Sequence, residues 1–324
     1  MTEWLLRRIV QSIFVILAMT VIVFIGVNVI GNPVDIMVSP DATAAERARI
    51  VTSLGLDKSL WQQYFIFLAD AARGNFGNSF AINQPALPTI IGRMPATLEL
   101  AVLAVLISLF VGIPLGLLAG VKKNSLLSKA VMAGSTAGFS LPTFWVGILL
   151  IMCFSVKLGW LPSSGRGETA PLFGVEFSFM TLDGLKHLIL PSITLALFQT
   201  ALLIRLVRAS VEEVLPQDYM KFARAKGLGP KRLVFIHLLK NIMIPVVTLV
   251  GIEFASTIAF AMVTEAIFSW PGMGKLIIDS IYLLDRPVII TYLMLITLLF
   301  VTINLVVDIV YTILDPRIRI GAEG

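Results

Sequence analysis

Six long apolar blocks, separated by polar segments, dominate the sequence. Each block has about 18 or more residues with few charges, which is the length that an α-helix needs to cross a hydrocarbon core of roughly 30 Å. A buried core helix of a soluble protein does not need this length. The pattern therefore predicts an all-α membrane protein with six transmembrane helices, at residues 9–30, 97–121, 130–156, 188–207, 245–268 and 288–314.

The longest polar segment, residues 31–96, separates the first two predicted membrane helices. The turn Gly31-Asn32-Pro33 stops the first helix, and two short helices are expected over 42–54 and 61–72. The second of these carries aromatic side chains that suit the level of the lipid headgroups. This segment either caps the membrane surface or forms a docking surface for an extracytoplasmic partner.

A second polar segment, residues 208–244, is regular enough to contain helices. Asp218 is a candidate N-cap of a short helix in which Tyr219, Phe222 and Ala223 share one face, and Gly227 ends this helix.

Gly229 and Pro230 then begin a second helix over 231–240, because proline is favoured at a first helical position. Its residues Leu233, Ile236 and Leu239 recur at helical spacing. A short helix beside a membrane with one apolar face fits a groove on another protein. The alternative is a loop that only covers the end of the helix bundle.

Lysine and arginine residues orient the chain in the membrane. With six helices both termini lie on one side, and 15 of the 25 lysines and arginines fall on that side. Five of the other ten lie in the 31–96 segment, and loops longer than about 60 residues cross the membrane largely regardless of charge. The termini are therefore expected to be cytoplasmic and the 31–96 segment extracytoplasmic.

This orientation gives the expected division of the chain. It comprises an N-terminal tail with the first membrane helix, 1–30; an extracytoplasmic segment, 31–96; a transmembrane core, 97–314, with the cytoplasmic loop 208–244; and a cytoplasmic tail, 315–324.

The composition supports a lipid environment and excludes several other classes. Hydrophobic residues make up 57% of the chain and charged residues 14%, whereas about a quarter of the residues of a soluble domain are charged. The net charge of +5 follows from the topology and needs no nucleic acid. One cysteine, Cys153, and two distant histidines, His187 and His237, provide neither a disulfide framework nor a Cys/His zinc site.

Polar residues inside the predicted membrane helices are candidates for function, because ionisable groups are costly there. Glu253 could line a transport path and attract a substrate ammonium group, or could pair with a group such as Asn304. Asp308 is expected to serve helix packing, and Glu99 and Glu265 to reach the membrane interface. The further candidates for the path lie on the polar side of the fifth helix: Ser256, Thr257 and Thr264.

The run from Asp218 to Leu228 resembles the signature loop of the dipeptide, oligopeptide and nickel permeases, a branch of the type I ABC importers. Segments similar to this family follow in the expected order over most of the chain. They are Leu56-Asp57-Lys58, Trp61-Gln62-Gln63-Tyr64, Ala96-Thr97-Leu98-Glu99-Leu100, Pro142-Thr143-Phe144-Trp145, Gly159-Trp160-Leu161-Pro162, Phe268-Ser269-Trp270-Pro271-Gly272 and Asp315-Pro316-Arg317-Ile318-Arg319.

The resemblance implies a type I ABC importer permease fold and a chain similar to the first permease subunit of a dipeptide system. It also implies four kinds of partner: a second homologous permease subunit, two cytoplasmic ATPase subunits, an extracytoplasmic substrate-binding protein and the lipid bilayer. The residues that would couple to the ATPase, of which Phe222, Ala223, Ala225 and Gly227 would face its cleft, are Asp218, Tyr219, Phe222, Ala223, Arg224, Ala225, Lys226, Gly227 and Gly229.

Two positions depart from the family. Lys221 stands where the general ABC-importer loop begins with an acidic residue, so a salt bridge to the partner is not expected from this position. The turn that relatives write Gly-Asp-Pro reads Gly31-Asn32-Pro33 here.

The chain has no P-loop, because Gly272-Met273-Gly274-Lys275 has the wrong spacing. It is therefore not expected to be an enzyme or to bind a cofactor, and ATP and Mg would be held by the partner subunits. The resemblance implies import of peptides, dipeptides first, by alternating access in the bacterial inner membrane. The alternatives are an ion-gradient-driven secondary transporter, and the same architecture importing nickel or glutathione. The sequence does not contain the motifs of an intramembrane enzyme.

Overall fold

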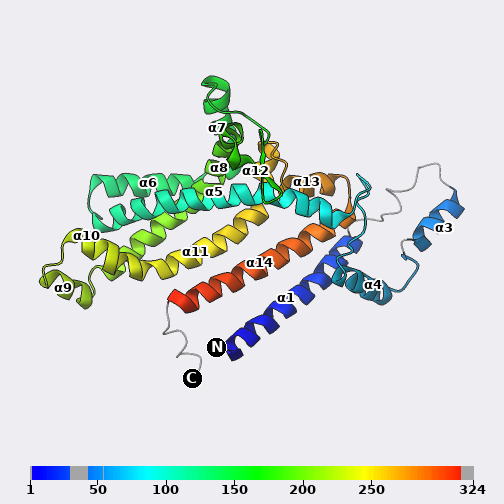
Figure 1. Cartoon of the computed structure of the whole chain (residues 1–324), viewed down its shortest axis with the longest axis horizontal. Coiled ribbons are helices and arrows are strands. Elements are labelled where there is room, and N and C mark those ends of the chain that lie inside the picture. The colour runs from blue at the N-terminus through cyan, green and yellow to red at the C-terminus, as the bar shows by residue number, and fades with distance from the viewer. Residues whose placement is uncertain (1, 30–42, 54, 315–324) are drawn as a thin grey trace. The chain divides into compact units, whose positions relative to one another are not determined.

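The computed structural model describes residues 2–29, 43–53 and 55–314 (Figure 1). Apart from one two-stranded hairpin, the elements of this part of the chain are helices, which confirms the all-α class. The chain divides into two compact units, Met1–Met94 with Gly272–Val301 and Pro95–Pro271 with Thr302–Gly324, which we call unit one and unit two. The Gly31-Asn32-Pro33 turn and the 315–324 tail lie outside the described residues.

Unit one contains two helices from the long polar segment between the first two membrane helices. The predicted helices at 42–54 and 61–72 are confirmed as α3 and α4, and Ser59 and Gln62 form a reciprocal capping box at the start of α4. The elements of unit one are α1 (Thr2–Val29), α3 (Ala44–Ser53), α4 (Leu60–Ala72), the first residues of α5 (Ala86–Val121), α13 (Met273–Tyr282) and most of α14 (Arg286–Leu314).

The aromatic residues of α4 point in two directions. Tyr64 and Phe67 pack on Phe24 of α1, with ring centroids 5.3 and 6.0 Å from the Phe24 ring. Trp61 and Phe65 are 75% and 61% exposed on this chain. The helix therefore uses one face to pack on α1 and leaves the other available to lipid headgroups or a partner.

Asp285 ties the start of α14 to the loop that precedes α5. Its carboxylate is buried and accepts hydrogen bonds from the Phe80 and Ala81 backbone N–H groups, at 3.0 and 3.3 Å, and from the Ser79 hydroxyl. Three donors satisfy a carboxylate that would otherwise be costly to bury. The contact fixes the loop against α14 within unit one.

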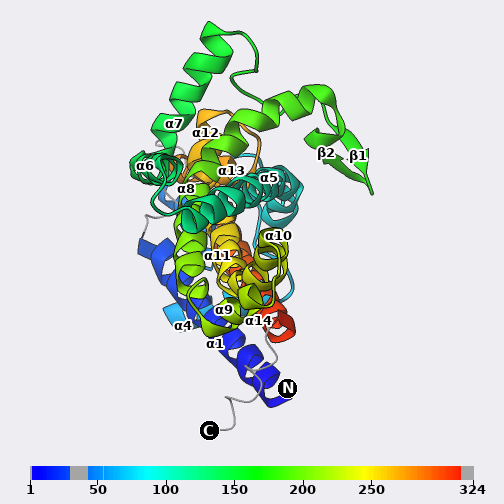
Figure 2. The same ribbon diagram turned by 90° about the vertical axis from the view of Figure 1, so that its left-hand side faces the viewer.

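Unit two is organised around α8 (Leu182–Val214), which packs against α6, α7, α11 and α12. Figure 2 shows α7 and the hairpin at one end of this unit and α9 at the other. The remaining elements are α6 (Leu126–Ser140), α7 (Thr143–Leu150) with η1 (Ile151–Lys157), β1 (Ala170–Leu172), β2 (Val175–Phe177), η2 (Ser178–Met180), α9 (Asp218–Ala225), α10 (Pro230–Arg232), η3 (Leu233–Leu238), α11 (Leu239–Phe260) and α12 (Met262–Ile267).

Five described helices are long and apolar enough to cross a membrane, and there are six if one bent pair counts as a single span. That pair is α6 and α7 with η1, bent by 105°, so the continuous third helix predicted at 130–156 is wrong. The cause is Pro142, because the residue before a proline is displaced from helical geometry, and Leu141 has ψ 131°.

The other membrane helices also differ from their predicted bounds. The fifth, predicted at 245–268, begins earlier and ends earlier as α11, Leu239–Phe260, because a turn at Ala261 separates it from α12. α5 begins at Ala86, although the apolar block starts at Thr97, and α8 continues to Val214. Hydropathy detects only the part of a helix that lipid surrounds, whereas the hydrogen-bonded backbone continues into polar surroundings. At about 1.5 Å per residue, the 33 residues of α8 span roughly 50 Å, more than the hydrocarbon core.

Three glycines let α5 approach α8 closely. A Cβ added at Gly116 would lie 2.7 Å from the Val207 Cβ, and one added at Gly120 would lie 2.6 Å from the Val211 Cβ. Gly112 faces Leu203 in the same way. Small residues at intervals of four allow two membrane helices to pack backbone to backbone, and this row went unnoticed in the sequence.

Candidate functional site

The helix α9 connects α8 to the next membrane helix and is anchored on one side. Met220 is fully buried and Ala223 is 6% exposed, and both belong to a core cluster with Val214, Leu233 and Leu238. The prediction that Ala223 shares one face with Tyr219 and Phe222 is therefore wrong. Its side chain faces this chain's own core and is not free to face a partner.

The opposite side of α9 is exposed. Phe222 is 61% exposed and Tyr219 40% exposed, and the Lys226 ammonium lies 4.6 Å from the centre of the Phe222 ring. Partial burial raises the pKa of Tyr219, so its phenol stays neutral. Arg224 and Ala225 are exposed as well. The exposed face of α9 therefore presents an aromatic ring beside two cationic side chains, and Phe222 remains accessible on this chain.

Asp218 does not cap α9. The N-cap is Gln217, and Asp218 is the first helical residue, where its carboxylate forms an ion pair of 2.9 Å with Lys221. The pair is exposed, so it adds little stability. Lys221, which stands where the resemblance leads us to expect an acid, is thus paired within its own helix.

Gly227 ends α9 as predicted, with φ +77°, a conformation that glycine adopts without strain. Gly229 and Pro230 then start the next helix, also as predicted. This helix is not a separate element over 231–240. α10, η3 and α11 follow one another without a non-helical residue from Pro230 to Phe260.

A π-helical stretch, η3, changes which residues face inward. Leu233 and Leu238, five residues apart, are buried, whereas Ile236 is 52% exposed. The predicted face of Leu233, Ile236 and Leu239 assumed α-helical spacing. A π-turn widens the repeat and rotates Ile236 away from the core.

A polar cluster lies within the helices of unit two. Glu253 of α11 is half-buried and lines a small cavity with Ser108 and Gln199. The Thr257 hydroxyl donates to the Glu253 carbonyl at 2.7 Å and accepts from the Gln199 amide. The side-chain oxygen of Gln199 is buried and accepts no hydrogen bond from the residues that the structure describes. Glu253 and Thr257 are thus brought together, with Ser108 and Gln199, which the sequence reasoning missed although Gln199 is a polar residue within an apolar block.

The other candidates lie apart from this cluster. Ser256 is half-buried on α11, whereas Thr264 is buried on α12, beyond the end of α11. Asn304 is exposed on α14, and no hydrogen bond joins it to Glu253 among the described residues, so this pairing is not supported. Asp308 is half-buried, and its packing role stays a prediction.

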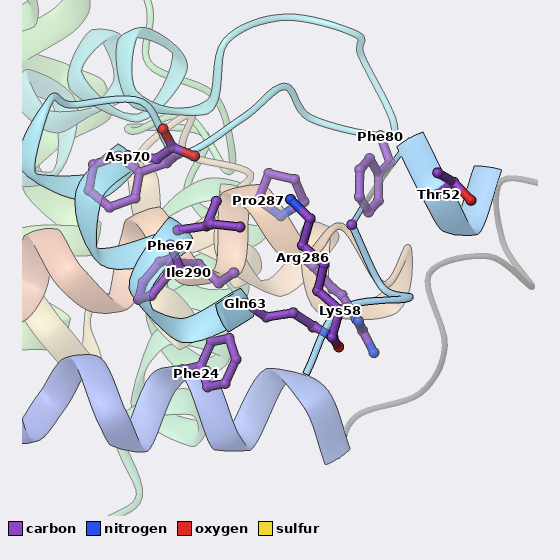
Figure 3. A pocket seen from close by; sticks show the side chains of 13 residues that line it. Phe24, Thr52, Lys58, Gln63, Phe67, Asp70, Phe80, Arg286, Pro287 and Ile290 are labelled. Carbon is purple, nitrogen blue, oxygen red and sulfur yellow. The ribbon is translucent and has the colours of Figure 1, made fainter. Parts of the chain in front are cut away.

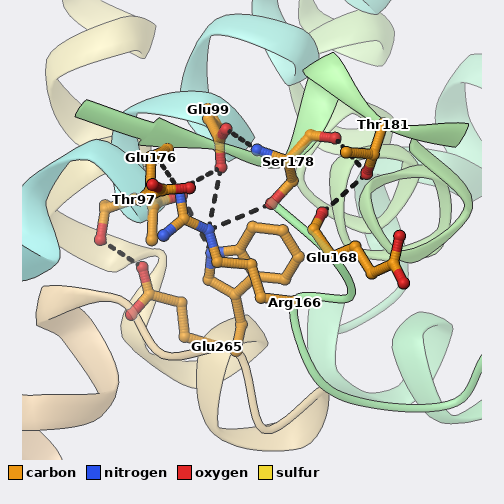
Figure 4. Close-up of polar contacts among 10 residues, drawn as sticks. Thr97, Glu99, Arg166, Glu168, Glu176, Ser178, Thr181 and Glu265 are labelled. Atoms are coloured by element: carbon orange, nitrogen blue, oxygen red, sulfur yellow. Dashed lines mark hydrogen bonds and ion pairs between the residues drawn. The ribbon is translucent and has the colours of Figure 1, made fainter. Parts of the chain in front are cut away.

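A second polar network fixes the hairpin to α5 (Figure 4). The buried Glu99 carboxylate pairs with the Arg166 guanidinium at 3.0 Å and accepts from the Ser178 N–H at 2.5 Å. Arg166 also donates to the Glu176 carbonyl at 2.7 Å. Glu99 thus has a buried position in this chain where an interfacial one is expected, because Arg166, 67 residues away, pairs with it; sequence spacing gives no sign of this contact.

Glu265, also expected near the interface, is buried in this chain as well. Its carboxylate accepts from the Thr97 hydroxyl at 2.6 Å, and the Trp270 indole N–H donates to the Ala96 carbonyl at 2.9 Å. The similar segments around residues 96–100 and 268–272 therefore meet in unit two. They hold the start of the apolar part of α5 to α12 and the turn that follows it.

Membrane-length helices with an internal polar cluster, and a small half-exposed helix at one end, define a polytopic α-helical membrane protein. The chain belongs to the family described as binding-protein-dependent transport system inner membrane component, whose model matches residues 112–320. The corresponding N-terminal family model matches residues 1–101. The chain is thus a multi-pass permease of this family.

Several relatives match almost the whole chain. The di/tripeptide transport system permease protein DppB of Pseudomonas aeruginosa is 39% identical and the dipeptide transport system permease protein DppB of Escherichia coli K12 is 37% identical; each alignment covers 98% of this chain and 99% of the relative. The glutathione transport system permease protein GsiC of Escherichia coli is 36% identical over 98% of this chain and 99% of its own.

Among solved structures, the chain resembles an inward-facing conformation of the MetNI methionine ABC transporter. The TM-score is 0.55 at 16% sequence identity, over 70% of this chain and 96% of the other. At this identity the likeness concerns the fold, and with the family match it confirms the expected permease architecture.

Proposed function

We propose that this chain forms part of the path of an ATP-driven importer of peptides, with dipeptides as the main substrates. The observation that carries the proposal is α9, which is anchored by Met220 and Ala223 and exposes Phe222 to a partner. Relatives that match this chain over almost their whole length include permeases named for dipeptides and for di- and tripeptides.

The proposed assembly contains two different permease subunits, two ATPase subunits that hold ATP and Mg, and an extracytoplasmic binding protein. In this assembly the ATPase contacts the exposed face of α9, which carries Phe222, Arg224, Ala225 and Lys226. ATP binds one conformation of the ATPase pair more tightly than the other and therefore shifts the equilibrium toward it. The two permease subunits, attached through α9, change conformation with the ATPase pair. Glu253 and Thr257 line the path, where the Glu253 carboxylate attracts the substrate ammonium group.

Disulfide crosslinking tests the coupling part of the proposal. In a Cys153→Ser background, which removes the chain's one cysteine, Phe222→Cys and Ala225→Cys are each combined with single cysteines along the ATPase cleft. Both should crosslink under oxidising conditions. Ala223→Cys is the matched control and should not, because position 223 is buried. Absence of crosslinks from both exposed positions would refute the coupling role of α9.

Transport in proteoliposomes tests the substrate. The reconstituted complex should accumulate a labelled dipeptide in the presence of ATP, and excess unlabelled dipeptide should compete better than glutathione or nickel. Stronger competition by glutathione would assign the chain to the substrate of GsiC instead. Transport by the isolated chain on an ion gradient would overturn the ATP-driven proposal altogether.

A further inference from the structure

Unit one contains an open cavity of about 450 Å³, which is lined neither by α9 nor by the polar cluster around Glu253 (Figure 3). Its size lies within the range of small-molecule sites. It is built by α4, by the ends of α1 and α3, by the loops that follow α3 and α4, and by the start of α14. The lining residues used below are Phe24, Lys58, Phe67, Asp70, Arg286 and Ile290.

Arg286 is the exceptional group in this cavity. It is only 8% exposed, and its guanidinium makes no hydrogen bond or ion pair with any described residue. The neighbouring Asp285 carboxylate cannot serve it, because that group is occupied by Ser79, Phe80 and Ala81. Arg286 is also the first residue of α14, where the helix dipole disfavours a cation. A buried, unpaired cation is costly, and an anion in the cavity would remove that cost.

The cavity has a second cation and one anion. Lys58 is exposed at its edge, Asp70 is half-buried, and neither forms an ion pair within the described part of the chain. In Figure 3, Arg286 and Lys58 lie toward one side of the cavity and Asp70 toward the other. Unpaired charges of both signs, held apart, suit a ligand that carries an anionic and a cationic group.

Most of the remaining lining is apolar, although Thr52 and Gln63 also contribute to it, and part of it comes from membrane helices. Phe24 belongs to α1 and Ile290 to α14, both long enough to span a bilayer, and Phe67 belongs to α4. The other face of α4 exposes Trp61 and Phe65, residue types that lie at headgroup level. The ligand is therefore amphiphilic and enters from the membrane interface.

We propose that this cavity binds the headgroup of a zwitterionic phospholipid such as phosphatidylethanolamine. The phosphate contacts Arg286 and Lys58, the ammonium contacts Asp70, and the first part of the acyl chains lies along Phe24 and Ile290. Nothing in this proposal depends on which solute the permease transports.

Native mass spectrometry of the purified full chain, together with the subunits that copurify with it, tests the site. After removal of endogenous lipid, the protein is titrated with short-chain phosphatidylethanolamine. Arg286→Gln should weaken binding about tenfold or more, since a charge-assisted contact to phosphate is lost. Lys58→Gln should weaken it less, because its ammonium is exposed. Lys275→Gln, a charge removal on α13 outside the cavity lining, should leave binding unchanged.

Asp70→Asn separates a zwitterion from a simple anion. It should weaken binding of phosphatidylethanolamine while leaving phosphatidylglycerol, which lacks the ammonium, unaffected. Inorganic phosphate and a dipeptide are added as competitors, and neither should displace the lipid at equal concentration. Displacement by the dipeptide would reassign the cavity to a peptide, and displacement by phosphate would reassign it to a free anion. Unchanged lipid binding in both Lys58→Gln, whose exposed position spares the fold, and Asp70→Asn would reject the site.

Discussion

Single residues decide how closely α5 and α8 pack. Gly116 faces the Val207 side chain and also the Ile204 carbonyl oxygen, which a Cβ would approach to 2.9 Å. Backbone cannot move aside as a flexible side chain can. In a membrane, where lipid is as apolar as leucine, such close contact supplies much of the attraction between helices.

Gly116→Ala should therefore destabilise the protein, by about 1–3 kcal/mol, as overpacked sites do. The control is Gly134→Ala on α6, where a Cβ meets no atom of this chain within 4 Å. The intrinsic preference of helices for alanine over glycine should make that change neutral or stabilising, by up to about 1 kcal/mol. Thermal unfolding in detergent measures both, and equal shifts of the two midpoints would contradict the packing argument.

Glu99 is the second residue with a large expected effect. Glu99→Gln leaves the Arg166 guanidinium, whose side chain is only 16% exposed, without its counter-ion. Breaking a buried pair in this way costs about 3–5 kcal/mol. The hairpin should become sensitive to limited proteolysis and the unfolding midpoint should fall. Glu176→Gln, which changes an exposed carboxylate in the same hairpin, should do neither.

At the scale of elements, α9 has one face buried in the core of this chain and one exposed face that we propose for coupling. Met220 lies in the core cluster, whereas Phe222, two residues away, is exposed. Helical geometry places residues two apart on different sides. The element can therefore be altered on one side without changing the other.

Met220→Ala should lower stability by about 2–5 kcal/mol through the cavity it leaves. Phe222→Ala should leave the unfolding midpoint of the purified chain unchanged but should reduce ATP-dependent transport by the complex. Unfolding and transport measured on the same preparations distinguish the two. A stability loss in Phe222→Ala as large as that in Met220→Ala would show that the exposed face also serves folding.

At the scale of the whole molecule, the charge distribution predicts cytoplasmic termini. α9 would then be cytoplasmic and the hairpin, on the other side of the roughly 50 Å length of α8, extracytoplasmic. In the Cys153→Ser background, a membrane-impermeant thiol reagent applied to intact cells should label Phe173→Cys, a residue that is 98% exposed in the hairpin. It should label Phe222→Cys only after the cells are opened. The reverse pattern would invert the topology.

The sequence was sufficient for features that depend on local chemistry. Apolar block length located the membrane helices, and Gly227, Gly229 and Pro230 located the ends of the helices around α9. The sequence was not sufficient where the burial of a residue depends on neighbours that are distant in the chain. Ala223 turned inward because α9 packs on Leu233, and Glu99 became buried because Arg166 meets it from a distant loop.

A continuous run of helical residues from Pro230 to Phe260 connects the α9 region to Glu253. Its first residue follows α9 after four connecting residues, and Glu253 lies 23 residues further on, about 35 Å at 1.5 Å per residue. In the proposed assembly this helix would link a displacement of α9 to the carboxylate. It departs from regular α-helical geometry at two places on the way, the widened turn at η3 and Pro245, which removes a backbone hydrogen bond, so a mutation that restores α-helical spacing at η3 would change the link close to α9 and leave Pro245 as it is.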